Sequence, residues 1–255
     1  MLLNRIAVAL LLLVGLPVSF GQTPLRVAAA ADLEPVLPRI LTQFEQSTGI
    51  HAEATYQASA ALTTQIQNGA PFYVFLSADL SYPKRLINAG LADSPTPIIY
   101  GRGTLVLWAR KDSKLPPPSV ELLRYPGLRR LAVANPDRAP YGRAAVAALT
   151  NLKIYDAIKS RLVTAENIAQ AAQFVDSGNA DAGLISLTSA LIPRLAGSGT
   201  YFALPRDLYP PIDQGAVVLK RTSQGPAAHN LLDYLLSTPV QAQLAKAGLT
   251  PVRAK

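Results

Sequence analysis

Two short turns built from small residues have the composition of an anion site. One lies within residues 25–33 (LRVAAAADL) and the other within residues 56–66 (YQASAALTTQI). Each follows an extended segment and precedes a stretch with the spacing of an amphipathic helix. Such a turn exposes backbone N–H groups, and the helix after it adds the positive end of its dipole. Two such turns facing each other could hold an anion with no Lys or Arg in contact.

A third segment, residues 69–79 (GAPFYVFLSAD), adds a more specific block. With it the chain resembles the molybdate-binding periplasmic proteins of ABC importers. That family carries A-A-(A)-S/N-L near its mature N-terminus, then a Ser-rich turn before L-x-x-Q-I, then G-A-P-x-D-x-F-x-S-A-D. The matching segments here are 28–33 (AAAADL), 59–66 (SAALTTQI), 69–79, 131–136 (LAVANP), 139–142 (APYG) and 180–183 (ADAG). The S-A-D block is specific to the family, whereas A-D-A-G is common to many binding proteins.

The resemblance implies a site in which main-chain N–H groups and hydroxyls from several loops hold an oxyanion. Carried onto this chain, it nominates Ala31, Asp32, Ser59, Tyr141, Ile168 and Ser186. Of these, Ser59, Ile168 and Tyr141 would hold molybdate itself. Ordinary structural roles also fit these residue types. A Ser after a strand is a common helix N-cap, an Ile at a helix start is typical of a core, and a Ser closing an apolar strand can satisfy a local backbone group.

Asp32 departs from the family pattern, which has Ser or Asn at this position. Those side chains donate a hydrogen bond, whereas an ionised carboxylate only accepts, and beside a dianion in a dry cleft it is costly. Three outcomes are open: the carboxylate turns back as an N-cap on the N–H of Glu34, it is protonated in the complex, or it accepts a proton from the ligand. The sequence favours the cap, because Asp is a preferred N-cap. The last outcome would favour a protonated oxyanion over molybdate.

The order of elements predicts an α/β protein. Apolar runs predict strands at 25–30, 52–56, 74–77, 104–109, 131–134, 182–186 and 214–219. Helical spacing predicts helices at 33–48, 60–68, 82–89, 142–149, 155–159, 167–177, 227–236 and 239–247. Alternating strands and helices indicate sheets with helices on their faces. The resemblance implies the two-lobed fold of type II periplasmic binding proteins, in which each lobe is a mixed sheet flanked by helices and two crossovers join the lobes.

We expect lobe 1 to comprise 22–100 and 213–255, and lobe 2 to comprise 101–212. Ligands of such folds bind in the crevice at the carboxyl ends of the strands. Asp79 and Asp181 are expected to cap turns rather than touch the ligand. His51 and His229 lie outside the expected loops, and the sequence shows no Ser-His-Asp order. We therefore expect no enzyme, since catalysis normally needs a titratable group within reach of substrate.

Composition and the N-terminus indicate an exported binding protein. Residues 1–21 have a positive start, an apolar run and small residues before Gln22, which predicts a cleaved secretory signal peptide and a periplasmic location. Its apolar run is too short to span a bilayer. The chain has no Cys, which excludes disulfides, thiolate metal sites and a lipoprotein anchor. A net charge of +8 is spread over dispersed Lys and Arg residues, which argues against nucleic acid and fits steering of small anions.

The sequence therefore predicts capture of molybdate or tungstate as cargo, with no cofactor, for delivery to the membrane permease of an ABC importer. We expect a monomer. Another oxyanion such as phosphate or sulfate is the main alternative. A ferric site is less favoured: Tyr141 and Asp32 are hard oxygen ligands, but the chain lacks an adjacent Tyr-Tyr pair. A periplasmic enzyme on the same fold is the remaining alternative.

Overall fold

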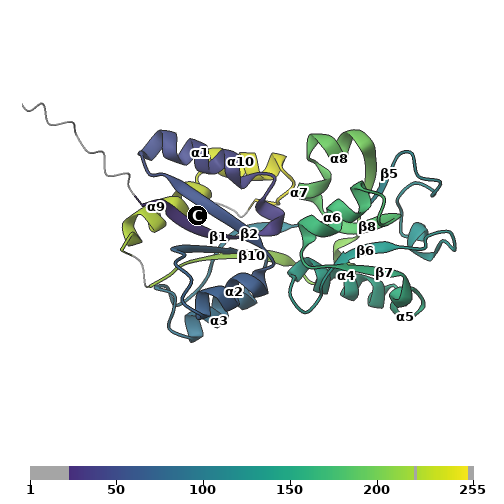
Figure 1. Ribbon diagram of the computed structural model, residues 1–255, viewed down its shortest axis with the longest axis horizontal. Helices are drawn as coiled ribbons and strands as arrows, with labels where there is room; N and C mark the ends of the chain where they lie inside the picture. Colours follow the sequence, from purple (N-terminus) through teal and green to yellow (C-terminus); the bar gives the residue numbers. More distant parts are fainter. Residues whose placement is uncertain (1–22, 221–222, 252–255) are drawn as a thin grey trace, which may run out of the picture.

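A computed structural model describes residues 23–220 and 223–251 of the chain. The signal peptide expected at 1–21 lies outside these residues. Within the described ranges, none of the helices combines the length and apolar character needed to cross a membrane. The strands form two five-stranded sheets, each in its own lobe, and the lobes lie side by side (Figure 1). Both sheets are mixed, which confirms the expected fold class.

The first sheet has the strand order β2-β1-β3-β10-β4. Its strands are β1 (Leu25–Ala30), β2 (Ala52–Gln57), β3 (Val74–Ser77), β4 (Ile98–Gly103) and β10 (Ile212–Val218). Strand β1 pairs in parallel with β2 and β3, whereas β10 runs antiparallel to β3 and β4. The helices of this lobe are η1 (Ala31–Leu33, a 3₁₀ turn), α1 (Leu37–Thr48), α2 (Ser59–Gln67), α3 (Ser81–Asn88), α9 (Gly225–Leu236) and α10 (Thr238–Lys246).

Successive side chains of a strand point to opposite faces of the sheet, so the core of this lobe has two parts, one on each face. Val27 and Leu76 pack with residues of α1, α9 and α10 on one face, and Ala28 and Phe75 pack with α2 and α3 on the other. The expected helix from residue 33 to 48 is shorter than predicted: a 3₁₀ turn ends at Leu33 and α1 begins only at Leu37. Pro35 lies in this gap, and proline lacks the N–H that helix continuation requires.

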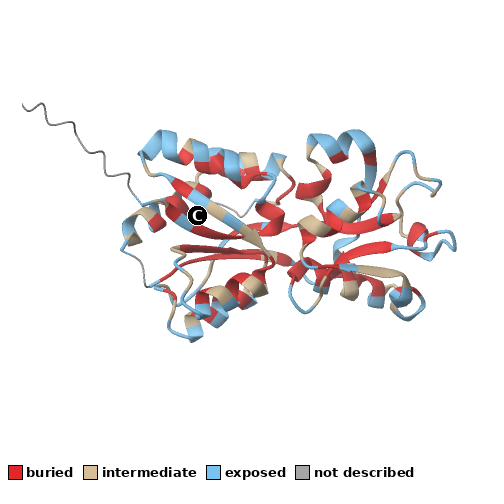
Figure 2. Ribbon diagram, viewed as in Figure 1, coloured by how far each residue is buried: buried red, intermediate tan, exposed pale blue. Residues whose placement is uncertain are grey.

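The second sheet has the strand order β7-β6-β8-β5-β9. Its strands are β5 (Leu105–Arg110), β6 (Leu131–Ala134), β7 (Leu162–Ala165), β8 (Ala182–Ser186) and β9 (Gly199–Ala203). The helices are η2 (Glu121–Arg124), α4 (Pro140–Asn151), α5 (Tyr155–Ile158), η3 (Lys159–Arg161), α6 (Ile168–Asp176), α7 (Leu187–Ala190), α8 (Pro193–Ser198) and η4 (Arg206–Leu208). Figure 2 shows the central strands of both sheets buried, while the helices turn exposed faces outward.

The chain passes between the sheets twice. It leaves the first sheet at Gly103 and enters the second at Leu105, then returns between Ala203 and Ile212. Helices α9 and α10 then pack back onto the first lobe. Two crossovers are thus present, as expected for this fold. The starts of η1, α2, α4 and α6 consequently meet where the lobes touch.

Candidate functional site

A small cavity lies between the lobes, and the starts of four helical segments line it. Five of the six nominated residues are among its walls: Ala31, Asp32, Ser59, Tyr141 and Ile168. The first three belong to the first lobe and the last two to the second. The residues that line the cavity include neither Lys nor Arg. Polar groups that line the cavity are backbone N–H groups, hydroxyls, the side-chain amides of Gln57 and Asn167, and one carboxyl, that of Asp32.

Helix geometry supplies the N–H groups, because the first N–H groups of a helix have no intrahelical partner. Helix α6 begins at Ile168, and Asn167 caps it by accepting the N–H of Gln170 at 2.9 Å. The N–H of Ile168 therefore stays available at the cavity wall. Helix α4 begins at Pro140, a residue suited to a first helical position, so Tyr141 stands in the first turn with its N–H equally unbonded by the helix. Both helix dipoles add positive potential at this point.

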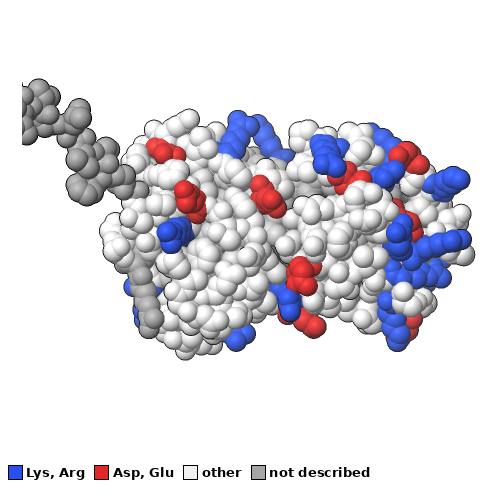
Figure 3. Space-filling model, in the orientation of Figure 1, with Lys and Arg blue, Asp and Glu red and all other residues white. Residues whose placement is uncertain are grey.

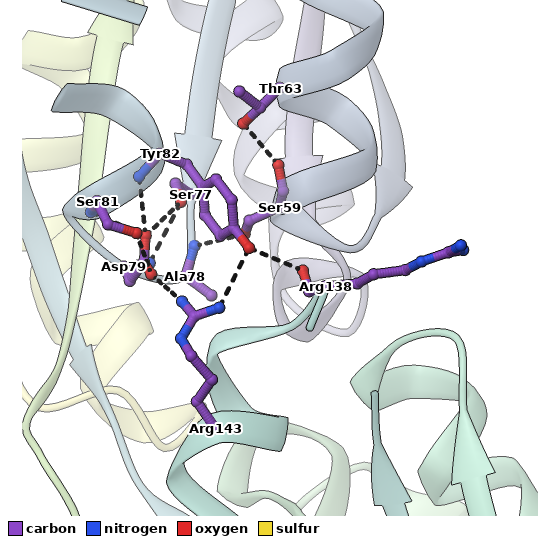
Figure 4. Close-up of polar contacts among 9 residues, drawn as sticks. All are labelled: Ser59, Thr63, Ser77, Ala78, Asp79, Ser81, Tyr82, Arg138 and Arg143. Atoms are coloured by element: carbon purple, nitrogen blue, oxygen red, sulfur yellow. Dashed lines mark hydrogen bonds and ion pairs between the residues drawn. The ribbon is translucent and has the colours of Figure 1, made fainter. Parts of the chain in front are cut away.

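Ser59 connects the second small-residue turn to the S-A-D block. It is 1% exposed and lies at the first position of α2, whose N-cap is Ala58. Its Oγ accepts the N–H of Ala78 at 3.1 Å (Figure 4). Ser59 therefore does not have the ordinary N-cap role that also fits its residue type; its Oγ accepts from the β3–α3 turn instead. The hydroxyl proton remains available for donation into the cavity.

Asp32 does not act as an N-cap, which corrects the outcome that the sequence favoured. Ala30 is the N-cap of η1, so Asp32 lies inside the turn, and its side chain reaches toward the other lobe. Its Oδ2 accepts hydrogen bonds from the Tyr141 hydroxyl at 3.1 Å and from the Gln214 amide. Among the described residues, Oδ1 has no hydrogen-bond partner. The carboxyl is 0% exposed.

Burial dominates the ionisation of Asp32. Removal from water raises its pKa to about 6, although the hydrogen bonds from Gln214 and Tyr141 act in the opposite direction. The pKa of Tyr141 is raised well above its usual value, first by burial and then by the neighbouring Asp32. Tyr141 is therefore a neutral phenol at physiological pH, and it donates to the carboxyl. This hydrogen bond joins the two lobes directly.

Gln214 is a site residue that the sequence reasoning missed. It lies on β10 and is 0% exposed, and its Nε2 also approaches the Tyr141 hydroxyl at 3.4 Å. The available signal was a polar residue inside the apolar run 212–218 (IDQGAVV). A buried amide in a strand needs hydrogen-bond partners, and here the partners come from η1 and α4.

A second group of contacts joins the lobes beside the cavity. Asp79 accepts the backbone N–H groups of Ser81 at 3.0 Å and Tyr82 at 3.2 Å, so its expected role at the start of α3 is confirmed. Arg143 of α4 forms an ion pair with Asp79 and donates to the Tyr82 hydroxyl at 3.1 Å (Figure 4). Its guanidinium also lies 5.3 Å from the centroid of the Tyr82 ring. We call Asp79, Tyr82 and Arg143 the clasp.

Comparisons with known proteins show the family of this chain. Residues 25–250 match the profile of the family described as bacterial extracellular solute-binding protein. The chain belongs to this family. A molybdate-binding protein of Azotobacter vinelandii is 39% identical over 210 residues, covering 82% of this chain and 83% of that protein. One from Rhodobacter capsulatus is 35% identical over 240 residues, covering 94% and 93% respectively.

Solved structures show the same fold. The periplasmic molybdate-binding protein of Azotobacter vinelandii superimposes with a TM-score of 0.85 at 32% identity, covering 90% of this chain and all of that one (100%). A sulfate-binding protein from Mycobacterium tuberculosis, 18% identical with a TM-score of 0.75 over 91% of this chain and 88% of its own, shares the fold alone.

The remaining nominated and titratable residues of this solute-binding protein lie away from the cavity. Ser186 is not among the lining residues; its hydroxyl caps α7 by accepting the N–H of Ser189 at 3.2 Å. Asp181 accepts two backbone N–H groups before β6, as expected of a structural residue. His51 pairs with Glu45 at 2.9 Å and His229 with Asp93 at 2.7 Å, both at the surface. In the described ranges, no three His, Asp or Glu side chains gather in a way that could hold a metal ion.

Proposed function

We propose that this protein captures molybdate or tungstate in the periplasm and delivers it to the membrane permease of an ABC importer. The observation that carries the proposal is the convergence of neutral donors from both lobes on one cavity. The relatives with 39% and 35% identity, both named as molybdate-binding proteins, support the choice of anion. In this proposal the protein is a monomer that binds and releases its cargo without catalysis, after removal of residues 1–21.

In this proposal the contacts that form as the lobes close on the anion supply the binding free energy. The first lobe, expected at 22–100 and 213–255, also includes residues 101–103 and Ile212, which pair in its sheet, and it acts as one closing unit. The rest of 101–212 acts as the other. As they close, N–H and O–H dipoles replace the water around the anion. Donors without net charge hold the ion by geometry, and the cavity radius then discriminates among tetrahedral oxyanions. On the face shown in Figure 3, Lys and Arg gather most densely at the outer end of the second lobe, with Asp and Glu among them. The net charge of +8 fits long-range attraction of anions.

Phosphate is a second candidate because of Asp32. A carboxylate accepts hydrogen bonds only, and a protonated oxyanion can donate one to it. Molybdate at neutral pH carries no proton to donate. The choice between these ligands therefore depends on the protonation of a single buried carboxyl, whose pKa is raised to about 6.

Calorimetric titration with molybdate, tungstate, sulfate and phosphate tests the proposal. We expect molybdate and tungstate to bind most tightly, and Ser59→Ala to weaken molybdate by roughly ten- to a hundredfold, the loss typical of a hydrogen bond to a charged group. Ser186→Ala is the matched control. It also removes a buried serine hydroxyl, but away from the cavity, so its affinity should stay within about twofold. Absence of oxyanion binding, or equal binding by Ser59→Ala and native protein, would overturn the proposal.

A further inference from the structure

Asp32 places a buried carboxyl in a cavity proposed to hold an anion. Its two oxygens are not equivalent. Oδ2 already accepts from the Tyr141 hydroxyl and the Gln214 amide, whereas Oδ1 has no partner among the described residues. A buried polar atom normally has a hydrogen-bond partner. Since Asp32 lines the cavity, an anion held there is the candidate partner for Oδ1.

The groups around Asp32 offer no positive charge. The titratable groups that act on it or on its neighbour Tyr141 are Tyr100 of β4 and Tyr209 near the second crossover, both phenols. The Tyr100 hydroxyl donates to the carbonyl of Ser77 at 3.1 Å, and the Tyr209 hydroxyl accepts the N–H of Leu105 at 3.1 Å. Gln214 on β10 is neutral. No ion pair of Asp32 occurs within residues 23–220 and 223–251.

An ionised Asp32 beside a dianion would place like charges together in a site with little water. Such pairs ionise together only at a large cost, and the usual result is that one group holds a proton. A carboxylic acid has one O–H donor, and the free oxygen, Oδ1, is where that proton can meet an acceptor. An oxygen of the anion is such an acceptor.

We infer that the site binds its oxyanion together with one proton, which lies between Asp32 Oδ1 and an oxygen of the anion. The inference rests on the proposed function and specifies it further. For molybdate the proton comes from solvent: ionised Asp32, one proton and the dianion combine, and no other bond forms or breaks. For hydrogen phosphate the proton arrives on the ligand. Both anions end in the same hydrogen bond, and they differ in the source of the proton.

Proton uptake makes molybdate affinity dependent on pH. With the lobes in contact as in the structure, burial raises the pKa of Asp32 to about 6, so above that pH the carboxyl is ionised and must gain a proton on binding. Linkage then requires the Kd for molybdate to rise up to tenfold per pH unit at higher pH. Hydrogen phosphate brings its own proton, and its binding should not weaken as the pH rises.

The test is calorimetry on the native protein from about pH 6.5 to 8.5, in buffers with different ionisation enthalpies. We expect close to one proton taken up per molybdate and a Kd that rises with pH. Asp32→Asn keeps the size of the side chain and donates without titrating, so its molybdate affinity should be level with pH and should exceed that of the native protein at pH 8. Glu34→Gln removes an exposed carboxyl two residues away and should keep the native pH profile.

The outcomes separate this inference from the proposed function. A pH-independent Kd with no proton uptake in the native protein would overturn the inference and leave molybdate binding standing. Loss of phosphate binding in Asp32→Asn, with molybdate binding retained, would support it. If neither anion binds to any variant at any pH, both the inference and the proposed function fail. The native titrations decide the matter even if Asp32→Asn folds poorly.

Discussion

Asp32 should also influence the stability of the ligand-free protein. Its pKa rises from an ordinary value of 3.8 to about 6 on folding, because the carboxyl is buried. A raised carboxyl pKa favours the folded state while the group is protonated, and this advantage is lost as the pH rises from about 4 through 6. Above pH 6 the folded protein holds a buried carboxylate at a cost of roughly 3 kcal/mol.

Asp32→Asn should therefore stabilise the ligand-free protein at pH 8. With about 2–4 °C per kcal/mol for a chain of this size, the melting temperature should rise by up to roughly 10 °C. The gain should shrink toward pH 4.5, where Asp32 of the native protein is mostly protonated. Thermal melts followed by circular dichroism at the two pH values measure it, with Glu34→Gln as control. An equal gain at both pH values would contradict burial of the charge as the cause.

At the residue scale, the sequence predicts the site residues that lie in recognisable motifs and misses those that only a tertiary contact brings to the site. The small-residue turns and the segment 139–142 contain four of the nominated residues that line the cavity, and the fifth, Ile168, was nominated from the resemblance alone. The amide of Gln214 reaches Asp32 from 182 positions away, which no local pattern reveals. The same contact explains why the N-cap expectation for Asp32 was wrong: two donors from distant elements replaced a local backbone N–H.

At the scale of elements, the strands with long apolar runs were predictable and the irregular ones were not. Strands β6 and β8 have the expected bounds of 131–134 and 182–186. Strand β4 (IIYGRG) carries two glycines, which disfavour a strand, and it forms because β10, more than a hundred residues later, pairs with it. The short strands β7 and β9 lie at the sheet edges, where little apolar pattern is needed.

At the scale of elements, the clasp connects the start of α3 in the first lobe with α4 in the second. Asp79 and Arg143 are partly exposed, with side-chain exposures of 17% and 42%, so the ion pair contributes modestly. Arg143→Gln should leave folding nearly unchanged but speed molybdate release by roughly three- to tenfold. Stopped-flow fluorescence measures the release rate, and the difference from native protein should shrink at high salt.

Arg138→Gln is the matched control for the clasp. The Arg138 side chain pairs with Glu166 within the second lobe at 2.7 Å, whereas its backbone carbonyl, which the variant keeps, accepts the N–H of Ala60 at 3.2 Å across the lobes. The rate at which Arg138→Gln releases molybdate should match the native rate. Equal acceleration by both variants would indicate a general charge effect, and the clasp would then have no specific role.

At the scale of the molecule, the two lobes meet where Tyr141 packs against the first crossover. Gly103 ends β4 at this point, and a Cβ there would overlap the Tyr141 phenol. Because Gly103 has no side chain, the Tyr141 phenol of α4 can reach Asp32. Gly103 lies at the first crossover and so controls contact between the lobes. A Cβ added at Gly101, on the same strand, would lie 3.7 Å from the Cβ of Leu249, which is an ordinary contact distance.

Gly103→Ala should therefore hinder closure, because the added methyl displaces Tyr141 and breaks its hydrogen bond to Asp32. We expect molybdate affinity to fall by at least about tenfold, the loss typical of a disrupted hydrogen bond to a charged group. In the presence of molybdate, small-angle scattering should show the native protein as compact as the structure, in which the lobes are in contact, and the variant more extended. Gly101→Ala makes the same change where there is room, so it should bind and compact like the native protein. Native-like closure of Gly103→Ala would show that the lobes can meet without Tyr141 in this position.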